Sequence, residues 1–169
     1  MMAKEIVNRV KNSGIMTIDF DNLLVPNIFE IDLKDWLVDD FFLVEKKFRK
    51  SINSHSWSKY SDSYVCIFCS NDAIIPQWAY MLISSKISDV TNKVVIGKSN
   101  QLYEKIYHDL INKLNINDYE NKSVIIKGCS SKKVPITAYH LITSRLKGVA
   151  KSIMYGEACS AVPVYKKPK

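Results

Sequence analysis

The second half of the chain alternates short apolar runs with amphipathic segments, and this alternation constrains the fold more than any other feature. Residues 64–69 are nearly all apolar and are bounded by polar residues, as expected of a strand buried on both faces of a parallel sheet. The same form recurs in three later runs, at residues 93–97, 123–128 and 152–156. The sequence therefore predicts four parallel strands joined by crossover helices.

The segments between these runs carry the features of helices. Apolar residues recur every four positions from Leu102 to Leu114 and form one face. Residues 76–88 and 135–147 each begin with a proline, whose fixed φ and missing N–H group suit the first turn of a helix. The expected fold class is α/β, a three-layer, mainly parallel Rossmann-like sheet of about four strands.

The first half of the chain differs, because two short strands come before its helix. Residues 15–20 and 29–33 have the composition of strands, and Pro26 with Asn27 predicts a turn between them, so we expect an N-terminal β-hairpin. Residues 44–53 carry apolar side chains at four-residue spacing and should form a helix. No tandem repeat is apparent.

The length of 169 residues suits one hydrophobic core. We therefore expect a single α/β domain over residues 1–169. Its expected parts are a hairpin and helix at 1–55, a parallel core at 56–163 and a frayed tail at 164–169.

The formal net charge is +7, which would suit an anionic partner, but nearly all the positive charge is lysine spread along the chain. Because nucleic-acid-binding surfaces gather their basic residues and favour arginine, we do not expect nucleic acid as the main partner. A basic binding module for nucleic acid or an acidic protein remains an alternative. No segment is apolar for the roughly 18 residues that a membrane span needs, so we expect a soluble, cytoplasmic protein with no membrane partner. A homo-oligomer is compatible with this sequence.

Three cysteines, Cys69, Cys129 and Cys159, stand just past expected strands, and each is followed by a serine. Ligands of an open parallel sheet bind beyond the carboxyl ends of its strands. If the three strands are neighbours, the thiols can converge and hold zinc or iron at about 2.3 Å, or carry sulfur. Cys66 lies three positions before Cys69 and faces the other side of the strand, so it should belong to the core.

A further ligand or a catalytic acid could come from Asp72, Glu157 or His55. Asp72 could equally cap the helix that follows it, and Glu157 could be a solvated loop residue. A thiol-dependent enzyme is an alternative to the metal or sulfur site, with Cys69 as its nucleophile. A purely structural role for the three cysteines also stays open, because cysteine is often buried. The sequence leaves open whether the protein is an enzyme.

Four segments resemble an uncharacterised family of small bacterial proteins, the domain of unknown function DUF2480. They are Glu5-Ile-Val-Asn-Arg-Val, Asp72-Ala-Ile-Ile-Pro-Gln-Trp-Ala-Tyr-Met, Lys127-Gly-Cys-Ser and Ala150-Lys-Ser-Ile-Met-Tyr-Gly-Glu-Ala-Cys-Ser. The resemblance covers nearly the whole chain and implies no catalytic residues. It implies a link to iron-sulfur cluster assembly, and hence proteins of that process as partners.

Overall fold

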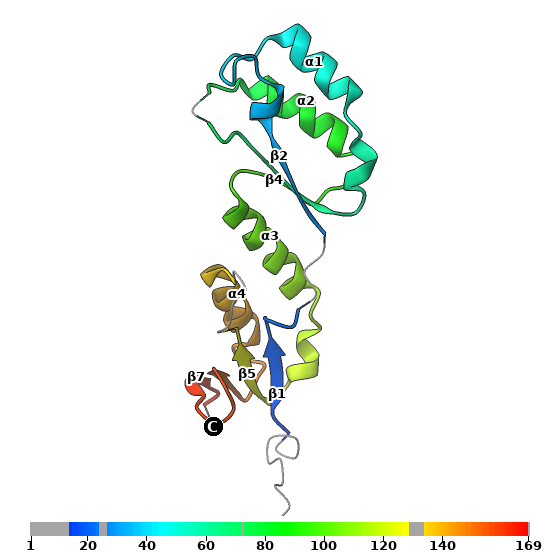
Figure 1. Cartoon of the computed structure of the whole chain (residues 1–169). Coiled ribbons are helices and arrows are strands. Elements are labelled where there is room, and N and C mark those ends of the chain that lie inside the picture. Colours follow the sequence, from blue (N-terminus) through cyan, green and yellow to red (C-terminus); the bar gives the residue numbers. More distant parts are fainter. Residues whose placement is uncertain (1–13, 24–26, 72, 129–133, 169) are drawn as a thin grey trace, which may run out of the picture. The chain divides into compact units, whose positions relative to one another are not determined.

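The computed structural model describes residues 14–23, 27–71, 73–128 and 134–168. These residues form two compact units, and each unit contains one mainly parallel sheet (Figure 1). Unit 1 consists of residues 14–23 and 107–168, whereas unit 2 consists of residues 27–106. The α/β class and the mainly parallel sheet are therefore confirmed. The single domain expected over residues 1–169 stays a prediction.

Unit 2 is a three-stranded parallel sheet with two helices packed on one face. The core of the unit joins Val65 and Ile67 of the central strand to Phe48 of the first helix and Ile83 of the second, and all four are fully buried. The sheet has the order β2-β3-β4. Its elements are β2 (Ile28–Asp32), η1 (Leu33–Trp36), α1 (Glu45–Ser54), η2 (Trp57–Tyr60), β3 (Tyr64–Phe68), α2 (Gln77–Ile87) and β4 (Val94–Ile96).

Unit 1 is a four-stranded sheet in the order β1-β5-β6-β7. Its first three strands are parallel, and β7 pairs antiparallel with β6 at the edge. Phe20, which follows β1, packs edge-on against Tyr107 and Tyr139 of the two helices. The elements are β1 (Met16–Asp19), α3 (Ser99–Asn112), which begins in unit 2, η3 (Ile116–Tyr119), β5 (Ser123–Lys127), α4 (Ile136–Leu146), β6 (Ser152–Tyr155) and β7 (Val162–Lys166).

The two units are copies of one structural repeat at a constant spacing of 59 residues. The central strand β3 begins at Tyr64 and its counterpart β5 at Ser123, while α2 begins at Gln77 and α4 at Ile136. The 3-10 turns η2 and η3, before the central strands, keep the same spacing. Asp62 and Asn121 are also equivalent, and both have positive φ, 58° and 55°. The sequence predicts no tandem repeat, and the structure shows that matching elements nevertheless recur at this spacing.

The buried residues of the two cores follow the same repeat. Val65 corresponds to Val124, Ile83 to Ile142, and both members of each pair are fully buried. The first strands, β1 and β2, also correspond. Asp32 of β2 pairs with Phe68 of β3, and Asp19 of β1 pairs with Lys127 of β5, which is the counterpart of Phe68. The spacing between these two first strands is 13 residues. Strand β1 is thus the first strand of the unit 1 copy, and unit 2 is inserted between β1 and the rest of that copy.

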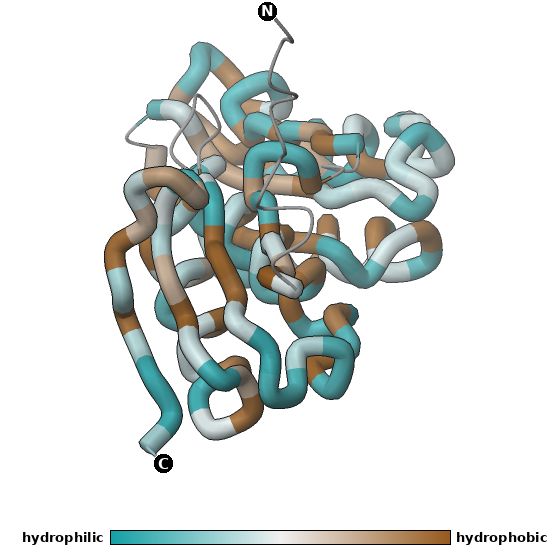
Figure 2. The backbone as a smooth tube through the Cα atoms, turned by 90° about the horizontal axis from the view of Figure 1, so that it is seen from below, coloured by the Kyte–Doolittle hydropathy of each residue, from teal (hydrophilic) through white to brown (hydrophobic). Residues whose placement is uncertain are grey.

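Two expectations about the chain ends need correction. The N-terminal hairpin is wrong, because β1 and β2 belong to different sheets and each pairs in parallel with a strand far along the chain. The frayed tail is also wrong, since Tyr165 and Lys166 belong to β7. Figure 2 shows apolar and hydrophilic stretches alternating along the backbone.

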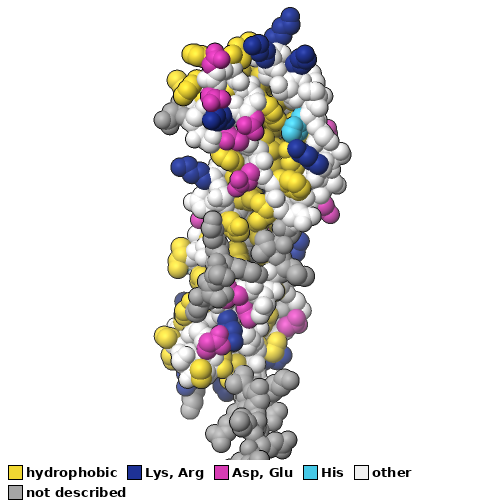
Figure 3. All heavy atoms as spheres, viewed as in Figure 1, with side chains coloured by type: hydrophobic (Ala, Val, Ile, Leu, Met, Phe, Trp, Pro, Cys, Tyr) yellow, Lys and Arg dark blue, Asp and Glu magenta, His cyan; other side chains and the backbone are white. Residues whose placement is uncertain are grey.

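None of the helices in the described part of the chain combines the length and the apolar character that crossing a bilayer requires. On the face shown in Figure 3, lysine and arginine side chains are interspersed with acidic ones and form no single stripe.

Candidate functional site

The candidate site is a polar pocket at the carboxyl edge of the unit 2 sheet, with a cavity volume of about 440 Å³. Open parallel sheets bind ligands at this edge, because the strand ends leave backbone groups and loops facing one crevice. The central strand β3 supplies Cys69 directly after its last residue. The lining includes Glu30, Phe68, Cys69, Asn71, Lys98 and Ser99.

Asp32, at the end of β2, holds the loop that follows β3. Its carboxylate accepts hydrogen bonds from the backbone N–H groups of Lys34 and Ser70, each at 3.0 Å. Burial alone would raise the pKa of Asp32, but the hydroxyl and N–H of Ser70, the N–H of Lys34 and the charge of Lys34 together lower it. The ionised carboxylate therefore fixes the backbone beside Cys69.

Asn71 holds the thiol of Cys69 in place. The Oδ1 atom of Asn71 accepts from Cys69 Sγ at 2.9 Å and from the backbone N–H of Ala73 at 3.2 Å. The Nδ2 atom of Asn71 donates to the backbone carbonyl of Asp40. Burial, followed by the charge of the neighbouring Cys69, raises the pKa of the Tyr80 phenol. The half-buried thiol is thus oriented by its neighbours.

Two opposite charges line the pocket on either side of the central strand. Glu30 belongs to β2 and Lys98 follows β4, and these strands flank β3. Both side chains are exposed, and neither forms an ion pair with any residue that the structure describes. Lys98 immediately precedes α3, whose first turn adds partial positive charge.

The equivalent edge of unit 1 has different chemistry. Lys127 corresponds to Phe68 and Glu157 to Lys98, and these two charges form an ion pair with an Nζ–Oε2 distance of 2.5 Å. The hydrogen bond that Lys127 donates to Glu157 raises the pKa of Lys127, and the charges of Glu157, Asp19 and Cys159 add to it. In unit 1, Lys127 and Glu157 therefore neutralise each other.

The Cys69 position also differs between the units, because its unit 1 counterpart is Gly128. A Cβ atom at Gly128 would meet Tyr139 Oη at 2.3 Å, and this hydroxyl donates to the carbonyl of Gly128. A phenol hydroxyl thus fills the space of the missing side chain in unit 1. Unit 2 has Cys69 at the same position, and this residue lines a pocket.

The structure places the cysteines predicted from the sequence in different surroundings. Cys69 lines the pocket, and Cys66 is fully buried and donates to the carbonyl of Gly97, which confirms its place in the core. Burial, followed by the charge of Glu30, raises the pKa of Cys66. Cys159 is exposed in a turn after β6 of unit 1. Cys129 lies outside the described residues.

Of the three further candidates, the structure describes Glu157 and His55. Asp72 lies outside the described residues, and Glu157 is the ion-pair partner of Lys127. His55 stacks on Tyr60 with ring centroids 5.6 Å apart, and its Nε2 atom lies 2.7 Å from Tyr60 Oη. Because Tyr60 precedes β3 and Cys69 follows it, His55 sits toward the opposite end of that strand.

The premise for a shared three-cysteine site is wrong. The three strands were expected to be neighbours, but β3 belongs to the unit 2 sheet, whereas β5 and β6 belong to the unit 1 sheet. Among the described residues, no group of three or more His, Cys, Asp or Glu side chains could hold a metal ion. Convergence of Cys69, Cys129 and Cys159 on zinc or iron stays a prediction.

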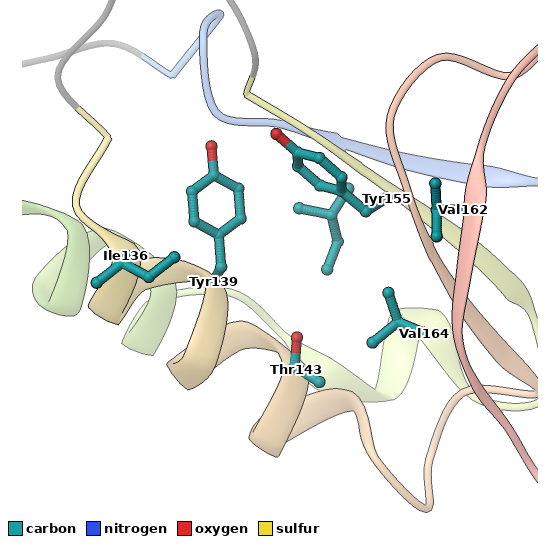
Figure 4. A pocket seen from close by; sticks show the side chains of 7 residues that line it. Ile136, Tyr139, Thr143, Tyr155, Val162 and Val164 are labelled. Atoms are coloured by element: carbon teal, nitrogen blue, oxygen red, sulfur yellow. The ribbon is translucent and has the colours of Figure 1, made fainter.

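Unit 1 contains a second cavity of about 420 Å³, between α4 and the neighbouring strands β6 and β7 (Figure 4). Its walls are mainly apolar, and two of the most exposed, Ile136 and Val162, are 81% and 59% exposed. Tyr139 and Tyr155 lie on its rim, with ring centroids 5.6 Å apart. The cavity has no acidic, basic or thiol side chain in its lining, so the polar pocket of unit 2 is the better candidate for chemistry.

Sequence reasoning found Cys69 but missed Glu30 and Lys98, which look like ordinary surface charges in the sequence. Comparing the chain with itself at a shift of 59 residues would have found Lys98. That shift aligns Pro76 with Pro135 and Gly97 with Gly156, and it places Lys98 opposite an acidic residue.

The chain is an α/β protein with two units, each built on a mainly parallel sheet. A pocket lined by a cysteine lies in one of these units. The chain belongs to the family described as "Protein of unknown function (DUF2480)", whose model matches residues 4–167. No curated protein and no solved structure matches the chain.

Proposed function

We propose that the protein is a thiol-dependent ligand-binding protein whose reactive group is Cys69. The observation that carries this proposal is the position of Cys69, which lines a pocket at the carboxyl edge of the sheet and whose thiol is hydrogen-bonded to Asn71. The thiolate attacks an electrophilic centre of the bound ligand, the leaving group departs with the electron pair, and the thiol proton passes to water. Lys98 attracts a negative group of the ligand to the same pocket.

Alkylation of the native protein tests this role. Iodoacetamide is added at neutral pH, and modification of each cysteine is followed by peptide mass spectrometry. We expect Cys69 to react at least about tenfold faster than Cys66, because the Cys66 thiol is buried and its pKa is raised. Comparable rates at Cys69 and Cys66 in the folded protein would refute a reactive thiol in the pocket.

A charged reagent gives a second measurement on the same thiol. Iodoacetate carries a carboxylate that Lys98 should attract. The ratio of the iodoacetate rate to the iodoacetamide rate at Cys69 should therefore be higher in the wild type than in Lys98→Gln. Lys50→Gln is the matched control, because Lys50 is an exposed lysine on α1 that does not line the pocket. An unchanged ratio in Lys98→Gln would show that Lys98 does not attract anionic reagents to Cys69.

The link to iron-sulfur cluster assembly is a separate proposal, in which Cys69, Cys129 and Cys159 bind zinc or iron or carry sulfur for proteins of that process. Its support is the family resemblance and the place of Cys69 at a strand end. Metal and sulfide analysis of freshly purified, reduced protein tests it. Absence of stoichiometric metal and sulfide, unchanged by Cys129→Ser, would reject this proposal without affecting the reactive thiol.

A further inference from the structure

The edge strand β4 of unit 2 is open, whereas its counterpart in unit 1 is covered. The repeat makes β6 the counterpart of β4, because these strands end at the equivalent residues Tyr155 and Ile96. In unit 1 the chain turns after β6 and returns as β7, which pairs antiparallel with β6. In unit 2 the chain enters α3 after β4, and among the described strands β4 pairs only with β3. The β4 edge therefore lacks the strand that its copy has.

The backbone of β4 has hydrogen-bonding groups directed away from its own sheet. The carbonyl of Lys93 and the N–H of Gly97 both bond to backbone groups of β3, at 2.9 Å each. Because bonding directions alternate along a strand, the N–H and C=O groups of Val94 and Ile96 point to the other side. No backbone group of a described residue outside the sheet bonds to either residue. This edge can therefore accept a further strand.

A groove runs beside this edge, and it also has a counterpart in unit 1. Its volume is about 480 Å³, and it lies between α2 and β4. Three of its lining positions recur in the unit 1 cavity, as the pairs Tyr80 and Tyr139, Ser84 and Thr143, and Ile96 and Tyr155. In unit 1, Val162 and Val164 of β7 complete the lining (Figure 4). In unit 2 nothing equivalent covers the groove, and its residues Met81 and Ile96 are 70% and 51% exposed.

Strand β4 lacks the residues that commonly keep an edge strand from pairing. Charged side chains and proline within an edge strand prevent the addition of another strand. The other described edge strands have such residues, namely Asp19 in β1, Glu30 in β2 and Pro163 in β7. Strand β4 consists of Val94, Val95 and Ile96, which are all β-branched. It is therefore the described edge that is best suited to accept a partner strand.

The sequence around β4 is complementary to itself in the antiparallel direction. With a two-fold axis at Val95, Val94 of one copy lies opposite Ile96 of the other, and both direct their backbone groups across the interface. Within residues 92–98, each lysine then lies opposite an uncharged residue, so no like charges face each other. The axis is perpendicular to the sheet, which places the grooves of both copies on the same face. Each copy can therefore cover the exposed apolar side chains of the other.

We infer that the protein forms a homodimer through the β4 edge of unit 2, in which two β4 strands pair antiparallel and their sheets become continuous. The second copy takes the place at β4 that β7 holds at β6. Val94 and Ile96 provide the backbone hydrogen bonds, and Met81 and Ile96 become buried in the joined grooves. The inference goes beyond the proposed function, because it does not depend on the reactivity of Cys69.

Sedimentation equilibrium of the full chain over a range of micromolar concentrations tests the dimer. We expect a monomer–dimer equilibrium in the wild type, and Ile96→Lys should weaken it at least about tenfold, because a charge then enters the interface of each copy. The matched control is Val164→Lys, which changes a similarly exposed residue of β7, the edge strand that contains Pro163. Both side chains are exposed, so both variants should fold, and circular dichroism checks this.

Three results of this experiment would overturn the inference. The first is a wild type that stays monomeric over the whole range of concentrations. The second is a dimer that Ile96→Lys does not weaken. The third is a dimer that Val164→Lys weakens as much as or more than Ile96→Lys, which would place the contact elsewhere.

Cross-linking tests the position of the two-fold axis without a charge in the interface. In Val95→Cys the two introduced thiols lie at the axis, where the Cα atoms of a non-hydrogen-bonded pair are about 4.5 Å apart, within the range of a disulfide. Oxidised glutathione should produce a linked dimer, and peptide mass spectrometry should find the two introduced thiols joined. Val94→Cys is the control, because position 94 lies opposite 96 and not opposite itself. No such link in Val95→Cys, or an equal one in Val94→Cys, would overturn the inferred pairing.

Discussion

Lys98 and Glu157 occupy the same position in the two copies of the repeat, directly after the glycine that ends the third strand, yet they carry opposite charges. Glu157 is ion-paired with Lys127, and Lys98 faces a pocket. One unit thus has an edge whose two charges form an ion pair, and the other has an edge where Glu30 and Lys98 line a pocket. This difference locates the candidate site in unit 2.

Converting the unit 2 edge to the unit 1 chemistry should close the pocket. In the double variant Phe68→Lys/Lys98→Glu, the two new charges stand where Lys127 and Glu157 form their ion pair. We expect the rate of Cys69 alkylation by neutral iodoacetamide to fall several-fold, because the paired side chains cover the thiol. Lys98→Glu alone creates no such pair and is the control. Equal rates in the double variant and the control would contradict the correspondence of the two edges.

Gly128 should tolerate no side chain while Tyr139 keeps its hydroxyl. A Cβ atom at this position would lie 2.3 Å from Tyr139 Oη, so Gly128→Ala must displace the phenol or the backbone. We expect a loss of about 1–3 kcal/mol in the free energy of unfolding, measured by urea denaturation. The double variant Gly128→Ala/Tyr139→Phe removes the clashing oxygen and should recover part of this loss. Purely additive effects of the two changes would show that the clash is not the cause.

Local sequence patterns predicted the four α-helices and every strand except β7, because each of these is encoded by its own residues. The proline before α2 and the apolar run of β3 are visible without any tertiary information. Which strands pair is a different matter, because β1 and β2 are both short and apolar and nothing local distinguishes their sheets. β1 pairs with β5 and β2 pairs with β3, and both partners lie far along the chain. A hairpin was therefore expected where two parallel pairings occur.

The candidate site was only partly predictable for the same reason. Cys69 was recognised because a cysteine just past a buried strand is unusual, and the strand was read correctly. Glu30 and Lys98 lie 39 and 29 residues away from Cys69 in the sequence, and only the strand order β2-β3-β4 brings them to one pocket. The expectation that three cysteine-bearing strands are neighbours failed because the repeat divides them between two sheets.

Asp32 should stabilise the fold through its ionised form. Asp32→Ala removes the acceptor for the N–H groups of Lys34 and Ser70, and we expect a loss of about 1–2 kcal/mol at neutral pH. Because the pKa of Asp32 is lowered in the folded state, this contribution is present above the unfolded pKa of about 3.9 and is lost as the pH falls through the folded value. Urea denaturation at several pH values measures the difference between wild type and variant.

The matched control for Asp32 is Asp89→Ala, which removes an exposed carboxylate from the end of α2. It should change stability by less than about 0.5 kcal/mol at every pH. A difference between wild type and Asp32→Ala that does not shrink in acid would contradict a role for the charge.

His55 should make the protein less stable as the pH falls below neutrality. Burial, followed by the charge of Lys59, lowers the pKa of His55, so the folded protein holds the ring neutral where the unfolded chain protonates it. Unfolding then takes up a proton, and stability rises with pH between the folded pKa and the unfolded value of about 6.5. His55→Phe keeps an aromatic ring against Tyr60 but cannot titrate, so its stability should change less over this range.

Two measurements check the behaviour of His55. Proton NMR of the ring should give a pKa below the ordinary value of about 6.5, and Lys59→Gln should raise it by removing a nearby positive charge. Urea denaturation of wild type and His55→Phe between neutral and mildly acidic pH gives the stability difference. An equally steep decline in both proteins would show that another group controls this pH range, and a His55 pKa above about 6.5 would contradict burial as the dominant influence.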